Sequence, residues 1–181
     1  ADGVAAFTIL GFVVYGYSMV CIGFGQGISP IVSICWGAKE KETAIKIRSI
    51  TNRILLAIGT LTALSFFVAG KRYAEIFGCS NSIADMVATG FRIYAITFLV
   101  MGYDVTGSMY FTSCGDAKSS AIISSLRGIV LLLAFILIFP AIFGMNGVWM
   151  ASPFAETLTS IVTFVLIRRQ VRKNKEEENA R

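Results

Sequence analysis

Asp104 is the residue of this sequence with the clearest capacity for chemistry, because it lies in the middle of an apolar stretch, FLVMGYDVTGSMYF. An ionisable side chain in such a segment is costly and usually faces a bundle interior or a water-filled cavity. A carboxylate there can bind Na⁺ or take up a proton, since burial penalises its charged form. We therefore expect Asp104 to couple to Na⁺ or H⁺, with Tyr103, Thr106 and Tyr110 lining a cavity around it.

Two further polar residues are candidates for the same cavity. Glu156 lies in a later apolar segment. Gln26 lies among glycines, where an amide can line a cavity or hydrogen-bond an irregular backbone. Both carboxylates also have a structural alternative: Asp104 can pair with Arg92 or Arg127, and Glu156 can form an ion pair or an interfacial cap.

No enzyme signature stands out in the sequence. There is no His, which removes the usual general base and the commonest zinc ligand. The four cysteines lack CxxC spacing, and there is no Walker A motif, HExxH motif or Ser/His/Asp set. We therefore expect a protein that is not an enzyme, with no catalytic residue and no cofactor beyond a coupling ion.

Composition and patterning predict an all-α integral membrane protein. The 181 residues are 55% hydrophobic with a mean hydropathy of +0.72, above the roughly 45–50% apolar content of soluble domains. The net charge of +5 does not indicate a nucleic-acid partner, because the basic residues lie in short loops and at the C-terminus. The partner of the apolar surface is the lipid bilayer, crossed by five helices at about residues 3–36, 43–69, 83–112, 119–139 and 148–167.

The basic residues divide unequally between the two sides of such a membrane. The loops 38–46 and 114–118 and the C-terminal tail share one side and hold most of the Lys and Arg residues, whereas Lys71 and Arg72 lie on the other. Basic loops are retained in the cytoplasm. The N-terminus is therefore expected outside and the C-terminus in the cytoplasm.

Irregular backbone is expected at three places. The end of the first apolar run carries a cluster that should bend easily, as a hinge or a packing site: Gly23, Gly25, Gly27 and Pro30. Residues 71–82 should form a long connection at the membrane interface. Residues 1–169 would make up the membrane region, and residues 170–181 a charged cytoplasmic tail whose last part is disordered.

Three stretches together resemble the multidrug and toxic compound extrusion (MATE) family of transporters. They are GISPIVSICWGA followed by a basic loop, SCGDAKSSAIISSLRG, and GMNGVWMASPFAE, and their order and spacing extend over residues 3–167. The family fold has two six-helix lobes. The resemblance implies that this chain is a partial lobe, the last five of twelve helices, whose partners are the N-terminal lobe and the first helix of the C-terminal lobe.

The resemblance also implies a function. Members of the family are antiporters of the cell (inner or plasma) membrane that export cationic or amphipathic compounds, xenobiotics among them, in exchange for Na⁺ or H⁺ by alternating access. In some branches acidic residues on the first and fourth helices of the C-terminal lobe bind the cation. The fourth corresponds to the helix that carries Asp104. The position that matches the family's acidic residue is Asp104 or, one residue earlier, Tyr103. The alternatives are a lipid-linked oligosaccharide flippase of the same superfamily and a structural membrane subunit.

Overall fold

A computed structural model describes residues 2–76 and 81–179, and these residues form long helices without a strand. The elements follow the order α1 (Asp2–Gly37), α2 (Lys41–Ile76), α3 (Asn81–Ser113), α4 (Ala117–Ser125), η1 (Leu126–Val130), α5 (Leu131–Phe143) and α6 (Met145–Asn179). The π-helical turn η1 joins α4 and α5 into one span, so five segments are long and apolar enough to cross a membrane. The expected all-α fold with five membrane-spanning helices is confirmed.

Two helices are longer than the sequence patterns predict. α2 continues to Ile76, so the first half of the expected connection 71–82 is helical; residues 77–80 lie outside the described part of the chain. α6 continues through the charged tail to Asn179, so the expectation that the last part of the tail is disordered is wrong for its described residues. One reason is visible at Arg172, whose Nε atom lies 2.9 Å from Oε1 of Glu176, four residues later on the same face.

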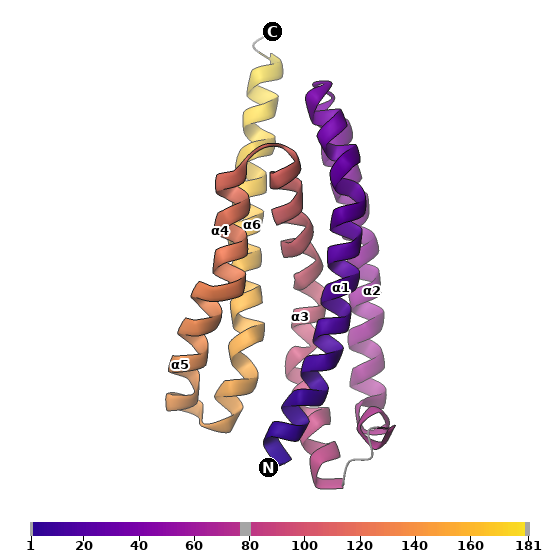
Figure 1. Cartoon of the computed structure of the whole chain (residues 1–181), viewed down its shortest axis with the longest axis vertical. Coiled ribbons are helices and arrows are strands. Elements are labelled where there is room, and N and C mark those ends of the chain that lie inside the picture. Colours follow the sequence, from indigo (N-terminus) through magenta and orange to yellow (C-terminus); the bar gives the residue numbers. More distant parts are fainter. Residues whose placement is uncertain (1, 77–80, 180–181) are drawn as a thin grey trace.

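α3 is the central helix, and it packs against α1, α2 and α6 (Figure 1). The second packing unit is the pair formed by α6 and the α4–η1–α5 span. Rings of Phe135 and Phe139 in α5 meet Phe154 in α6 edge-on, with centroids 6.3 and 5.2 Å apart. The outward faces remain apolar, as the 84% exposed Val68 and 75% exposed Leu137 illustrate, because their solvent is lipid and not water.

Short turns connect the spans at the two ends of the molecule. Gly115 and Gly144 adopt positive φ values of 78° and 58° at the α3–α4 and α5–α6 turns, a conformation that costs glycine little. Asp116 then caps α4 by accepting a hydrogen bond from the backbone N–H of Ser119 at 3.1 Å. The α1–α2 turn, the α3–α4 turn and the end of α6 lie together at one end, and the N-terminus lies at the other (Figure 1).

Candidate functional site

The candidate site lies where α3 and α6 approach closely. A Cβ atom added at Gly107 would lie 2.5 Å from Cγ2 of Thr163, so a larger residue at position 107 would push the helices apart. Small residues at such contacts allow membrane helices to approach backbone to backbone. The close approach brings polar side chains from α6 within hydrogen-bonding distance of α3.

Asp104 is fully buried at this contact and is hydrogen-bonded to α6. Its Oδ2 atom accepts a hydrogen bond of 2.8 Å from the hydroxyl of Ser160. Its Oδ1 atom is buried and has no hydrogen-bond partner among the described residues. In that same part of the chain Asp104 forms no ion pair: Arg92 lies over the ring of Phe67, 5.5 Å from its centroid. A buried carboxylate with one unused oxygen can accept a proton or a cation there.

Glu156 lies one turn before Ser160 on α6. It pairs with Arg127, which the sequence also offers as a partner for Asp104. Nε of Arg127 donates to both carboxylate oxygens of Glu156, at 2.8 and 3.0 Å. Arg127 belongs to the π turn η1, so this ion pair ties the α4–η1–α5 span to α6. The structure thus places Glu156 in an ion pair, and its predicted role as a cavity residue stays a prediction.

The other residues predicted to surround Asp104 point elsewhere. The Thr106 hydroxyl lies 2.6 Å from Oδ1 of Asn52 on α2, and 2.7 Å from the backbone carbonyl of Gly102. Tyr103 and Tyr110 lie against Arg48 of α2, whose guanidinium carbon is 4.9 and 5.6 Å from their ring centroids. The described contacts therefore do not join these three residues to the Asp104 carboxylate.

Gln26 lines a groove of about 530 Å³ between α1, α3 and α4. The groove is rich in hydroxyl groups, contributed by Ser29, Ser33, Ser108, Thr112, Ser120 and Ser124. Several of these bond one another, since Oγ of Ser108 lies 3.0 Å from Oγ of Ser120 and 2.8 Å from Oγ of Ser124. The position of Gln26 agrees with its predicted place at a cavity wall, although Asp104 does not line this groove.

The glycine and proline cluster of α1 does not break the helix, which runs without interruption from Asp2 to Gly37. Gly25 packs directly against the side chain of Met109 on α3, whereas a Cβ atom at Gly23 or Gly27 would meet nothing within 4 Å. Pro30 lines the hydroxyl-rich groove beside Gln26. Gly25 is therefore a packing residue, and the hinge role of the cluster stays a prediction.

Three polar residues at these contacts were not anticipated from the sequence. They are Ser160, Asn52 and Arg48. For Ser160 a signal existed, because it follows Glu156 by four residues and so shares its helical face. Asn52 and Arg48 carry no such signal, since they lie beside the basic stretch that begins α2 and read as interfacial residues.

No three His, Cys, Asp or Glu side chains come together to hold a metal ion within residues 2–76 and 81–179. Around Asp104 the described side-chain oxygens include its own two and the hydroxyls of Ser160 and Thr163. This set is suited to a proton or to a loosely held monovalent cation, and it is too small to bind a divalent metal ion on its own.

These features define the class: a multi-pass, all-α membrane protein with a carboxylate buried between two of its spans. The chain belongs to the MatE family, because the family model MatE matches residues 1–139. This match confirms the family resemblance of the sequence.

Relatives and solved structures agree with the family. The chain is 26% identical over 161 residues to "Probable multidrug resistance protein YoeA" of Bacillus subtilis, covering 85% of this chain and 34% of the relative. It is 19% identical over 154 residues to "Multidrug export protein MepA" of Staphylococcus aureus, covering 82% of this chain and 33% of the relative. The fold matches the Vibrio cholerae MATE transporter VcmN in its bent form with a TM-score of 0.84 at 17% identity, over 96% of this chain and 40% of that one. The chain thus spans about a third of the length of the curated relatives it matches.

Proposed function

We propose that this chain is part of a secondary active multidrug efflux transporter that exports cationic or amphipathic compounds in exchange for H⁺ or Na⁺. Its place would be the last five of twelve helices, completed by an N-terminal lobe and one further helix. Membership of the MatE family supports this proposal, as do the names of two relatives, a multidrug export protein and a probable multidrug resistance protein. Alternating access would then move the site between the two sides of the cell membrane.

The buried carboxylate of Asp104 is the observation that carries the proposal. A charged group at this depth is costly and needs a compensating role, and among the described residues Asp104 meets the Ser160 hydroxyl and forms no ion pair. Protonation removes that cost and deprotonation restores it, so the carboxylate can favour different conformations in its two states. Asp104 would act as the coupling group, and Ser160 would hold it in position.

A proton is the ion that the surroundings of Asp104 favour. A proton needs only the unused Oδ1 atom, whereas Na⁺ needs several oxygen ligands, more than the side chains of Asp104 and Ser160 provide. The two ions are separable by measuring efflux with either the proton gradient or the Na⁺ gradient collapsed. Loss of efflux only when the proton gradient is collapsed is the expected result.

The orientation of the chain in the membrane follows from the distribution of its basic residues. The α1–α2 turn, the α3–α4 turn and the end of α6 lie at one end (Figure 1) and carry most of the basic residues. Because basic loops remain in the cytoplasm, we place this end and the C-terminus in the cytoplasm.

The test is Asp104→Asn in cells that express the longer protein to which we assign this chain. Efflux of ethidium should be abolished while the amount of protein in the membrane is unchanged. The matched control is Asp116→Asn, because this substitution removes a carboxylate outside the spans and keeps a good helix N-cap. Unchanged efflux in Asp104→Asn would refute the assignment of Asp104 without affecting the family.

Two alternative functions remain testable in the same cells. A structural subunit is favoured by one observation, since Asp104 is fully buried and does not line the hydroxyl-rich groove; in that case Asp104→Asn should lower the thermal stability of the protein and leave cells no more sensitive to ethidium. A lipid-linked oligosaccharide flippase would translocate labelled lipid-linked glycan in vesicles and would not export ethidium.

A further inference from the structure

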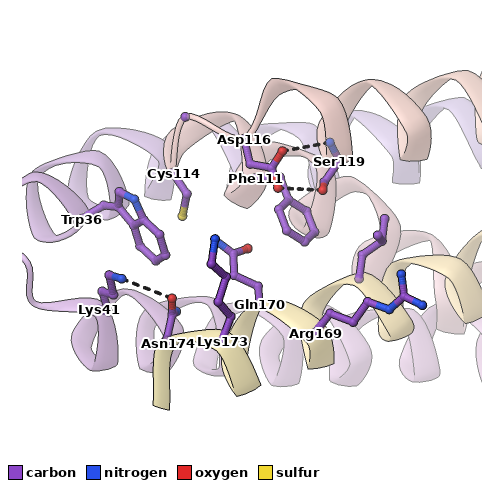
Figure 2. A pocket seen from close by; sticks show the side chains of 12 residues that line it. Trp36, Lys41, Phe111, Cys114, Asp116, Ser119, Arg169, Gln170, Lys173 and Asn174 are labelled. Atoms are coloured by element: carbon purple, nitrogen blue, oxygen red, sulfur yellow. Dashed lines mark hydrogen bonds between the residues drawn. The ribbon is translucent and has the colours of Figure 1, made fainter. Parts of the chain in front are cut away.

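A second cavity of about 530 Å³ lies at the end of the molecule where α1 and α3 finish and α2 begins (Figure 2). One wall is formed by Trp36, Phe111 and Cys114, and the opposite wall is a face of α6. Figure 2 shows Gln170 and Lys173 extending from α6 into the space between these walls. The cavity is separate from the Asp104 site, whose residues do not line it.

The lining of this cavity is basic. Lys41, Arg169 and Lys173 contribute cationic side chains, and among the described lining residues the one carboxylate is Asp116. That carboxylate is already engaged, because Oδ1 accepts from the backbone N–H of Ser119 at 3.1 Å and Oδ2 from its hydroxyl at 2.7 Å. The net charge of the walls therefore favours an anion.

Two amide side chains on α6 have polar atoms that are buried and unused. Oδ1 of Asn174 accepts a hydrogen bond of 3.3 Å from Nζ of Lys41, which leaves its Nδ2 donor without a partner among the described residues. In the same part of the chain Oε1 of Gln170 lacks a donor. Buried polar groups are normally satisfied, so these two atoms indicate a ligand with both an acceptor and a hydroxyl donor.

A fourth cationic group, Arg48, lies behind the aromatic wall. Arg48 is 6% exposed, and its Nε and Nη2 atoms have no hydrogen-bond partner among the described residues. It lies over the rings of Tyr103 and Tyr110. The Tyr110 ring packs edge-on against Trp36 of the cavity wall, with centroids 6.2 Å apart, so the Arg48 charge lies one ring behind that wall.

We propose that this cavity is a binding site for a phosphate ester, and that its occupant is the headgroup of an anionic phospholipid such as phosphatidylglycerol. The phosphate oxygens would accept from Arg169, Lys173 and Nδ2 of Asn174, and a glycerol hydroxyl would donate to Oε1 of Gln170. Guanidinium and ammonium groups are the usual partners of phosphate in proteins.

The location favours a lipid over a free phosphate ester as the occupant. Trp36, in the cavity wall, is the type of residue that marks the membrane–water interface. The cavity opens among helix ends that carry basic loops, and basic pockets on the cytoplasmic side of membrane helices suit anionic headgroups. A lipid held there would contact α1, α3 and α6 at once.

The test compares two double variants of the chain purified in zwitterionic detergent. Arg169→Gln/Lys173→Gln removes two cavity cations four residues apart on α6. Arg168→Gln/Arg172→Gln removes the same charge with the same spacing, but Arg168 lies over Phe164 and Arg172 pairs with Glu176. All four side chains are exposed, so neither variant threatens the fold. Binding of phosphatidylglycerol, phosphatidylcholine and glycerol 3-phosphate is measured by native mass spectrometry.

We expect phosphatidylglycerol to bind more tightly than phosphatidylcholine, and Arg169→Gln/Lys173→Gln to weaken it about tenfold. The Arg168→Gln/Arg172→Gln control should change the affinity less than twofold. Equal weakening in both variants, or no preference for phosphatidylglycerol, would overturn the site. Equally tight binding of glycerol 3-phosphate, with the same dependence on Arg169 and Lys173, would overturn the lipid as the occupant.

Discussion

The hydroxyl of Ser160 on α6 donates a 2.8 Å hydrogen bond to the carboxylate of Asp104 on α3, and this bond connects the buried acid to α6. Ser160 also lies 3.5 Å from the backbone carbonyl of Val100, so its single hydrogen has two acceptors on the same helix. A change in the charge of Asp104 would alter which acceptor the hydroxyl prefers, and through it the contact between α3 and α6.

Ser160→Ala should lower efflux severalfold without changing the amount of protein in the membrane. The substitution removes the hydrogen bond from Ser160 to the carboxylate, and a hydrogen bond to a charged group contributes about 1.5–3 kcal/mol. Ser160→Thr retains the hydroxyl and should restore most of the activity. Ethidium efflux in whole cells measures both variants, and equal loss in Ala and Thr would indicate a packing defect instead.

Gly107→Ala should destabilise the chain, because its Cβ atom would collide with Cγ2 of Thr163. Thr163→Ser deletes that methyl group, so the double variant Gly107→Ala/Thr163→Ser should recover much of the loss. Thermal unfolding in detergent measures the effect, which we expect to reach about 1–3 kcal/mol for the single variant.

Gly27→Ala is the matched control for that experiment, since a Cβ atom at Gly27 meets nothing within 4 Å. We expect this change to leave the stability equal or slightly higher, by up to about 1 kcal/mol. If the hinge prediction for α1 holds, efflux falls in Gly27→Ala although stability does not, whereas unaltered efflux argues against the hinge.

Removing one partner of the Arg127–Glu156 ion pair should lower the free energy of unfolding more than removing both partners together. Glu156 is buried, with a side chain 9% exposed, and Arg127 is 24% exposed. Arg127→Gln leaves a buried carboxylate uncompensated and should cost about 3 kcal/mol, and the double variant Arg127→Gln/Glu156→Gln should cost less than that single change. A double-mutant cycle of thermal unfolding checks this, and simple additivity of the two single variants would show that the pair is not coupled.

Labelling with a membrane-impermeant maleimide should report the orientation. Lys118→Cys lies in the α3–α4 turn region and Arg72→Cys near the end of α2, both exposed and at opposite ends of the molecule. In a background with Cys21, Cys35, Cys79 and Cys114 replaced by Ser, Lys118→Cys should react only when the reagent reaches the cytoplasm. Arg72→Cys should react with intact cells, and the reverse pattern would invert the proposed topology.

The number and order of the membrane spans are predictable from this sequence. A long apolar run between charged turns can cross lipid as a helix, which satisfies its own backbone hydrogen bonds. The ends of the helices are not predictable in the same way. Nothing in the residues from Lys71 to Ile76 forces the chain out of the helix, and α2 continues through them. The same is true of the charged end of α6, where charge does not prevent helix formation.

The candidate site was predictable in part. Asp104 is identifiable because a carboxylate in an apolar run has few inexpensive environments. Its neighbours are not, because Tyr103 and Thr106 lie close to it along the chain yet face α2, where they meet Arg48 and Asn52. The residue that binds Asp104 is distant in sequence, and only the approach of α6 at Gly107 brings Ser160 to it.

The π turn of residues 126–130 sets the rotational phase of the span that contains it. In an unbroken α-helix, Phe135 and Phe139 would lie about 80° and 120° around the axis from Arg127. One residue absorbed by the π turn reduces both angles to about 20°, which is why the ion pair and the aromatic contacts all reach α6. α4 and α5 therefore share one axis but differ in the rotational position of their residues about it. Straightening the turn into a regular α-helix without removing a residue would rotate the aromatic face away from α6 while leaving every side chain of α5 unchanged.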